Sequence, residues 1–203
     1  MQLQDGFDGS SEPTRMSLID YQELISKVNS ALPACGMTRV IAIDGPAGSG
    51  KTTLSYALES NLDNFIVQTI HMDALYQGWD DALTPTLTRT LENQILKPIS
   101  LGKRAEYRLF DWFEMKPGST VSFEPPEFLI LEGVGSAQAI TRKYANFLLW
   151  IDVASELGLQ RVLDRDGAEI EAQMRKWQLL ETDFFERDRT RECAAQRIDG
   201  NLY

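Results

Sequence analysis

Histidine, cysteine and long apolar runs are scarce in this sequence. Its 203 residues include one histidine and two cysteines, Cys35 and Cys193. The cysteines match no metal-ligand spacing and suggest no disulfide framework, so we expect both to be reduced, small apolar side chains. No apolar run reaches the roughly 18 residues that a membrane span needs, and no secretory leader is recognisable. We therefore expect a cytoplasmic protein without a membrane role.

Basic residues are also comparatively few. The chain has 20 Lys and Arg against 30 Asp and Glu, which gives a formal net charge of -10. Such an acidic surface repels phosphate backbones, so we expect no nucleic-acid partner. A small nucleotide whose charge is neutralised by magnesium is not excluded by this argument, because a local phosphate-binding site can outweigh the overall negative potential of the protein. Assembly with further copies of the chain stays open.

The length and composition suit one globular domain. Hydrophobic residues make up 43% of the chain and charged residues 25%, which is ordinary for a folded protein. We predict a flexible tail over residues 1–16, because this stretch is polar and lacks periodicity. A single domain follows over 17–203. It opens with an amphipathic helix, since apolar residues between 18 and 32 recur at helical spacing before Pro33 and Gly36.

Short apolar runs predict the strands of a buried parallel sheet. These runs are 39–44, 65–70, 128–131, 147–151 and a short one near 197–198. Helical spacing appears in 52–62, 86–97, 153–166 and the apolar stripe from 170 to 184. Loops and short strands are expected over 103–126. The predicted architecture is three-layer α/β/α with a mostly parallel five-stranded sheet.

A glycine-rich turn follows the first predicted strand. Residues 45–52 read Gly-Pro-Ala-Gly-Ser-Gly-Lys-Thr and match G-x-x-x-x-G-K-[ST] at every specified position. Glycines let backbone N–H groups approach phosphate oxygens, and the following helix adds its positive dipole end. Lys51 can reach the β- and γ-phosphates, and Thr52 offers a hydroxyl to Mg²⁺. The predicted ATP-binding residues are Gly45, Pro46, Ala47, Gly48, Ser49, Gly50, Lys51, Thr52 and Thr53.

Two acids follow the ends of inner strands. Asp73 follows the second strand and Glu132 the third. Ligands of open parallel sheets bind at the carboxyl ends of the strands, so both acids should face the cleft beside Lys51. An acid there can accept a proton from an attacking hydroxyl or hold magnesium. We assign the first role to Asp73 and the second to Glu132, together with Thr52.

With this motif between a strand and a helix, the predicted fold is a three-layer α/β/α P-loop NTPase. The motif alone does not decide the class of P-loop protein. The sequence has no Asn-Lys-x-Asp guanine reader and no Leu-Ser-Gly-Gly-Gln signature, which disfavours a GTPase and a transporter ATPase. Aromatic residues gather between 76 and 112, in the region that we assign to the phosphoryl acceptor, the molecule whose hydroxyl receives the phosphoryl group. They either face a planar base or sugar, or fill a shallow core beneath a long loop. These residues are Tyr76, Trp79, Tyr107 and Trp112, of which Tyr76, Tyr107 and Trp112 are predicted to bind the acceptor.

At this point the chain resembles the uridine kinase and phosphoribulokinase-like group of P-loop kinases. The segments that carry the resemblance are 45–52, 73–76, 110–112, 131–133 and 161–166. The resemblance implies that Asp73 is the base toward a sugar hydroxyl and that Tyr76 lines the acceptor pocket. It also implies a lid over about 161–176 whose Arg161 and Arg165 are catalytic, with Arg175 a further candidate. ATP and Mg²⁺ are the implied cofactors.

Departures from the family concern the acceptor. Uridine kinases usually carry a histidine shortly after the segment that resembles 110–112, whereas this chain has Glu-Met-Lys at 114–116 and its only histidine is His71. The acidic pair at 80–81 could hold ribose hydroxyls or begin a helix. Residues 41–50 also look like cytidylate kinases, but the Gly and Arg that those enzymes carry after the residue matching Asp73 are absent.

The sequence therefore predicts ATP-dependent phosphoryl transfer to a hydroxyl of a small molecule, with a nucleoside-like acceptor favoured over a monophosphate. A cytidylate-type kinase, a non-catalytic ATP sensor and a slow ATPase are the alternatives.

Overall fold

The computed structural model describes residues 14–15 and 19–201. Most of the tail predicted over 1–16 lies outside the described residues. Its described part, Thr14–Arg15, forms the short strand β1. We expected the first helix between 18 and 32, and within the described residues it runs over Tyr21–Ser30 as α1, capped by the Asp20 side chain.

The central sheet is parallel and has the strand order β1-β8-β7-β2-β6-β3. All five strands predicted from the sequence are present, and β1 extends the edge beside β8. Their bounds are β2 Arg39–Asp44, β3 Val67–His71, β6 Phe128–Glu132, β7 Phe147–Asp152 and β8 Gln196–Asp199. Every residue of β6 is buried, and so are five of the six in β2, which explains their unbroken apolar character.

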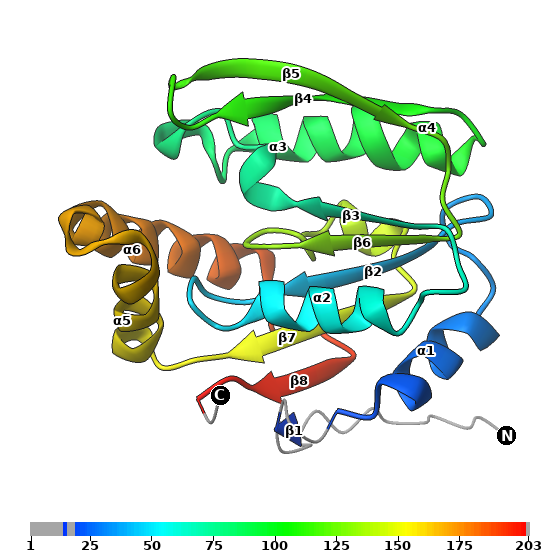
Figure 1. Cartoon of the computed structure of the whole chain (residues 1–203), viewed down its shortest axis with the longest axis horizontal. Coiled ribbons are helices and arrows are strands. Elements are labelled where there is room, and N and C mark those ends of the chain that lie inside the picture. The colour runs from blue at the N-terminus through cyan, green and yellow to red at the C-terminus, as the bar shows by residue number, and fades with distance from the viewer. Residues whose placement is uncertain (1–13, 16–18, 202–203) are drawn as a thin grey trace, which may run out of the picture.

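Helices cover both faces of the sheet, as Figure 1 shows. On one face α1 and α2 (Lys51–Ser60) pack in one core with side chains of β2, β6 and β7. On the other face α3 (Pro85–Thr90) continues through a π-helical segment, η4 (Leu91–Leu96), into α4 (Lys97–Ser100), and all contribute to a second core. The predicted three-layer α/β/α architecture is confirmed.

Two further helices stand at the carboxyl end of the sheet (Figure 1). They are α5 (Ser155–Asp166), ended by Gly167 as the sequence predicts, and the long α6 (Glu171–Asp188). Short 3₁₀ turns join the larger elements: η2 Met72–Ala74, η3 Trp79–Asp81, η5 Thr141–Lys143 and η6 Ala168–Ile170.

The segment 103–126 is more regular than the expected loops and short strands. It forms an antiparallel hairpin of β4 (Ala105–Asp111) and β5 (Lys116–Phe123), separate from the main sheet. The hairpin lies over the α3–α4 helix in Figure 1. Its turn brings Trp112 toward the carboxyl end of β3, where the Trp112 indole Nε1 donates to the Asp73 carbonyl at 3.0 Å.

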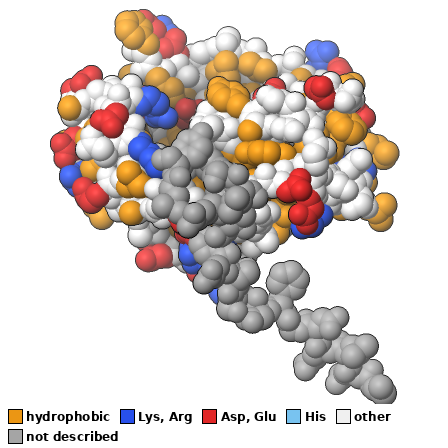
Figure 2. Space-filling model, turned by 60° about the horizontal axis from the view of Figure 1, so that its bottom comes forward, with side chains coloured by type: hydrophobic (Ala, Val, Ile, Leu, Met, Phe, Trp, Pro, Cys, Tyr) orange, Lys and Arg blue, Asp and Glu red, His pale blue; other side chains and the backbone are white. Residues whose placement is uncertain are grey.

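The described helices contain no segment that is both long and apolar enough to span a bilayer. Figure 2 shows acidic, basic and apolar side chains interspersed over the part of this face that the grey atoms leave visible.

Candidate functional site

The loop between β2 and α2 is built to receive an anion. Gly48 and Gly50 have φ values of 73° and 99°, a region that side chains disfavour. Gly50 is the N-cap of α2 and provides no side-chain cap, so the first N–H groups of the helix face the cleft without a capping carboxylate or hydroxyl. Phosphate oxygens suit such a position. The residues present therefore fit the nucleotide that the sequence motif implies.

Lys51 lies at the start of α2 with its ammonium group inside this loop. Its Nζ donates to the Gly45 carbonyl at 2.8 Å and to the Pro46 carbonyl at 2.7 Å. The residue is only 7% exposed, and burial is the main cause that lowers its pKa. Lys51 is thus held among oxygen acceptors at the place where the cradle would hold phosphates.

Thr52 and Glu132 meet on the floor of the cleft. The Thr52 hydroxyl donates to Glu132 Oε1 at 3.2 Å, and His71 Nδ1 contacts Glu132 Oε2 at 2.5 Å. The hydrogen bond to Glu132 raises the pKa of His71. Among the described residues, no group of three or more His, Cys, Asp or Glu could hold a metal. A hydroxyl and one carboxylate nevertheless fit Mg²⁺, which in phosphoryl-transfer sites takes most ligands from phosphates and water.

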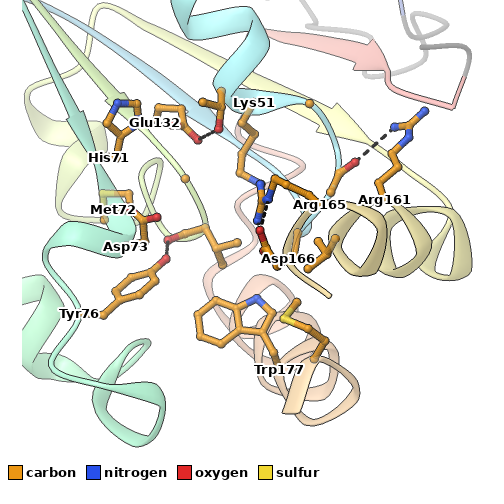
Figure 3. Close-up of a pocket in the computed structure, with 18 of the residues that line it drawn as sticks. Lys51, His71, Met72, Asp73, Tyr76, Glu132, Arg161, Arg165, Asp166 and Trp177 are labelled. Atoms are coloured by element: carbon orange, nitrogen blue, oxygen red, sulfur yellow. Dashed lines mark hydrogen bonds and ion pairs between the residues drawn. The ribbon is translucent and has the colours of Figure 1, made fainter. Parts of the chain in front are cut away.

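Asp73 lies across the same cleft, on the η2 turn that follows β3. The cleft has a volume of about 850 Å³, and Lys51, Thr52, Asp73 and Glu132 all line it. Figure 3 shows Lys51 arriving from α2, Asp73 from η2 and Glu132 from the end of β6. Asp73 is exposed. The structure thus brings together the acid predicted as the base, the acid predicted as the metal ligand, and the phosphate loop.

The aromatic residues only partly follow the prediction. Tyr76, Trp79 and Trp112 line the cleft together with Trp177 of α6. The ring centroid of Trp79 lies 5.1 Å from that of Trp112 and 5.8 Å from that of Trp177. Tyr76 is 5% exposed, and its hydroxyl donates to the Val134 carbonyl at 2.7 Å. It therefore contributes to the core as well as to the wall of the cleft.

The structure corrects the prediction that Tyr107 binds the acceptor, because this residue does not line the cleft. It is 5% exposed and packs edge-on against Phe123 of β5, at a centroid distance of 6.4 Å. Side chains alternate between the faces of a strand, and Tyr107 lies on the face of β4 turned toward the core. Of the two alternatives given for the aromatic residues, contact with the acceptor or filling of the core, the structure supports core filling for Tyr107.

The arginines of the predicted lid differ in position. Arg161 and Arg165, both on α5, line the cleft. Arg161 donates to the carbonyls of Gly48 and Gly200 at 3.2 and 2.9 Å. Arg165 forms a two-point ion pair with Asp166, at 2.7 and 2.6 Å, as Figure 3 shows. Arg175 lies outside the cleft and pairs with Glu156 and Glu171.

The remaining predicted nucleotide-binding residues divide in two. Ala47, Gly48, Gly50 and Thr53 line the cleft. Gly45, Pro46 and Ser49 do not line it, although the Gly45 and Pro46 carbonyls accept hydrogen bonds from Lys51 Nζ. The acidic pair at 80–81 lies just before α3, where the Asp81 carboxylate accepts a hydrogen bond from the hydroxyl of Thr84, the N-cap of that helix. The structure thus favours the helix-start interpretation for this pair.

Two buried acids behind the loop were not predicted. Asp44 is fully buried and accepts N–H bonds from Gly45, Gly135 and Ala137, and burial raises its pKa to about 6. Glu181 of α6 is 3% exposed and accepts the Ala47 N–H at 3.0 Å. The sequence feature that could have revealed Glu181 is its position one helical turn after Trp177, where an acid interrupts an otherwise apolar helix face.

Comparison with known proteins agrees with this geometry. No family model matches the chain. A curated uridine kinase from Staphylococcus epidermidis is 28% identical over 145 residues, 65% of this chain and 70% of that one. A curated uridine kinase from Macrococcus caseolyticus is 26% identical over 142 residues, 64% and 69% of the two chains. The solved structure of a possible uridine kinase from Bacillus stearothermophilus aligns with a TM-score of 0.64 at 20% identity, over 91% of this chain and 100% of that one.

The chain is therefore similar in sequence to uridine kinases and has the fold of P-loop kinases. Together these likenesses support a P-loop phosphotransferase.

Proposed function

We propose that this protein transfers the γ-phosphoryl group of ATP to a hydroxyl of a small, uncharged, nucleoside-like acceptor. The observation that carries the proposal is the shared cleft of Lys51, Thr52, Asp73 and Glu132 at the carboxyl end of the sheet. The similarity to curated uridine kinases supports the same reaction class. A reaction that consumes ATP also fits the cytoplasmic location expected from the sequence.

The phosphate side of the cleft supplies positioning and charge. The loop N–H groups and Lys51 hold the β- and γ-phosphates in line with the acceptor, and Arg165 neutralises charge on the transferred group. Thr52 and Glu132 would hold magnesium, which when bound neutralises charge on the phosphate oxygens. Phosphoryl transfer depends mainly on such positioning and electrostatics, because the protein forms no covalent bond to the group transferred.

Asp73 provides the base. Its exposed carboxylate lies opposite Lys51 in the cleft, where it can accept a hydrogen bond from the acceptor hydroxyl. As the hydroxyl oxygen attacks the γ-phosphorus, its proton passes to Asp73 and the bond to the β,γ-bridging oxygen breaks. ADP leaves with the electron pair of that bond.

The acceptor side of the cleft favours an uncharged molecule. Its lining includes Met72, Tyr76, Trp79, Trp112 and Trp177. Among the described residues that line the cleft, the lysines and arginines are Lys51, Arg161 and Arg165, all on the phosphate side. His71, which also lines the cleft, is bound to the Glu132 carboxylate. A monophosphate acceptor would need a cation opposite the lysine and the two arginines. The three tryptophans instead suit the face of a sugar or a planar base.

The proposal is tested by coupled ADP release with Mg-ATP against nucleosides, nucleoside monophosphates, sugars and small alcohols. We expect ADP formation to depend on an uncharged hydroxyl compound and to disappear in Lys51→Met. ADP release that no acceptor stimulates would indicate an ATPase instead. Nucleotide binding without ADP release would indicate a sensor, and stimulation only by monophosphates would indicate a cytidylate-type kinase.

The Asp73→Asn variant tests the role of the base. Because proton acceptance typically contributes about 10²–10⁴-fold to the rate, we expect kcat to fall by that order while the affinity for ATP is retained. Steady-state kinetics with the identified acceptor measures both values. Asp63→Asn, an exposed acid outside the cleft, should keep wild-type kinetics. An unchanged kcat in Asp73→Asn would remove Asp73 from the mechanism.

A further inference from the structure

Glu181 links the phosphate loop to the helix that carries part of the acceptor wall. Its Oε2 accepts the Ala47 N–H at 3.0 Å and the Trp177 indole N–H at 2.8 Å. Ala47 belongs to the loop, and Trp177 lines the cleft one turn earlier on α6. One carboxylate oxygen therefore holds the loop backbone and an acceptor-side ring in a common position.

The surroundings of Glu181 make its charge costly. The side chain is 3% exposed, and buried acids lose the hydration that favours ionisation. Burial raises its pKa to about 7, the Lys51 charge and the two hydrogen bonds oppose that rise, and the Asp44 charge adds to it. The other charged or titratable side chains around the loop and cleft are Arg161, Arg165 and Asp166 of α5, Glu132 of β6, His71 of β3 and Asp73 of η2. Near neutral pH both protonation forms of Glu181 are therefore populated.

A bound polyphosphate would disfavour the ionised form of Glu181 in two ways, through Lys51 and through its own negative charge. Lys51 currently donates to the Gly45 and Pro46 carbonyls, and phosphate oxygens in the cradle would draw its ammonium group toward them. The positive charge that favours ionised Glu181 would then be shared with the nucleotide. The phosphates also add negative charge beside the carboxylate, which disfavours its ionised form. A protonated carboxyl keeps an oxygen that can accept the Ala47 N–H bond.

We propose that Glu181 is a positioning residue that ties the phosphate loop to α6 and takes up a proton from solvent when a nucleotide binds in the loop. The proton adds to a carboxylate oxygen, and no bond to the nucleotide is formed. This inference rests on the proposed function only in that the loop binds a nucleotide. Its consequence is that nucleotide affinity rises as the pH falls through neutrality.

Isothermal titration calorimetry with the magnesium complex of a non-hydrolysable ATP analogue tests this linkage. Titrations at pH 7.5 in two buffers of different ionisation enthalpy give the protons taken up per bound nucleotide. With a starting pKa of about 7, we expect an uptake of roughly half to three-quarters of a proton. The uptake should be lost in Glu181→Gln, whose side chain keeps an acceptor oxygen. It should persist in Glu186→Gln, an exposed position on the same helix.

The outcomes separate this inference from the proposed function. Binding with equal proton uptake in wild type and Glu181→Gln would overturn the role of Glu181 and leave the proposed function intact. Absence of any nucleotide binding would overturn the proposed function and this inference together. Because Glu181→Gln could fold poorly, the wild-type uptake is also measured from pH 5.5 to 8.5. It should be small at the acid end and larger near neutrality, and uptake that is absent or independent of pH would equally overturn the inference.

Discussion

At the scale of single residues, the cations of the cleft are all bound to protein oxygens. Lys51 donates to loop carbonyls, Arg161 to the Gly48 and Gly200 carbonyls, and Arg165 to the Asp166 carboxylate. Arg161 thereby supports the backbone of the phosphate loop. Arg165 is held by the side chain of its neighbour in sequence, at the exposed end of α5, and it lines the cleft.

Arg165 is accordingly the arginine that we expect to stabilise the transferred phosphoryl group. Removing one preorganised donor to a developing negative charge typically costs about 10²–10³-fold in kcat, and we predict a loss of this size for Arg165→Ala. Steady-state kinetics with the acceptor identified above measures it. Arg175→Ala is the matched control, because Arg175 pairs with Glu156 and Glu171 outside the cleft. Equal losses in the two variants would contradict the assignment.

The predicted positions of the site residues agree with the structure where a local sequence pattern specifies the backbone. The spacing of Gly50, Lys51 and Thr52 defines a loop and a helix start by itself, and the acids Asp73 and Glu132 follow from strand ends. Tyr107 failed because facing the core or the cleft depends on the register of β4, which the sequence left open. Glu181 was missed because its partner Ala47 is distant in the chain, and no local pattern links them.

At the scale of elements, helix α5 rests directly on the phosphate loop. Two glycines make this approach possible. A Cβ at Gly48 would lie 2.1 Å from the Gly158 carbonyl oxygen, and a Cβ at Gly158 would lie 2.6 Å from the Ala47 carbonyl oxygen. Both distances are far below van der Waals contact. Helix α5 and the loop are therefore positioned by backbone packing as well as by Arg161.

Gly158→Ala tests this packing. In an isolated helix the change would add about 1 kcal/mol of helix propensity. Here the new methyl group meets backbone, so the loop or α5 must move, and such overpacking costs about 1–3 kcal/mol. We predict a lower melting temperature and a raised KM for ATP, measured by thermal denaturation and kinetics. Gly118→Ala in β5, where the Cβ meets only ordinary contacts from 3.4 Å, should leave the KM for ATP unchanged. A Gly158→Ala variant with wild-type KM would show that the contact is unimportant.

The elements that sequence reasoning described least well are those without a buried, periodic face. The sheet strands were visible because β2 and β6 are buried almost throughout. In the hairpin, every residue of β5 is exposed or only partly buried, so its polar sequence lacks both the apolar run and the clean alternation that indicate strands. Its pairing with β4 is a tertiary feature. The edge strand β1 has two residues, too few for any periodicity.

At the scale of the whole molecule, ionisation of the two buried acids opposes folding. Asp44 and Glu181 both stand behind the phosphate loop, and burial raises their pKa values to about 6 and about 7. When the folded form has the higher pKa, the native state binds more protons than the unfolded state over the pH range between the two values. The free energy of unfolding then falls as the pH rises through that range. The fold thus gives up stability at neutral pH to keep anionic groups beside its anion-binding loop.

The loss of stability caused by ionisation of Glu181 can be measured by comparing the wild type with Glu181→Gln. The pKa of Glu181 rises from 4.5 to about 7 on folding, and each unit corresponds to about 1.4 kcal/mol. The unfolding free energy of the nucleotide-free wild type should therefore fall, relative to Glu181→Gln, by about 1–3 kcal/mol between pH 5 and pH 8. Urea denaturation at intervals of one pH unit measures the gap. Asp44 and the net charge contribute nearly equally to both proteins, so their effects largely cancel. Glu186→Gln should follow the wild type at every pH. A gap between wild type and Glu181→Gln that does not change with pH would mean that Glu181 has the same pKa in the folded and unfolded chain. The carboxylate would then not be a buried charge behind the loop.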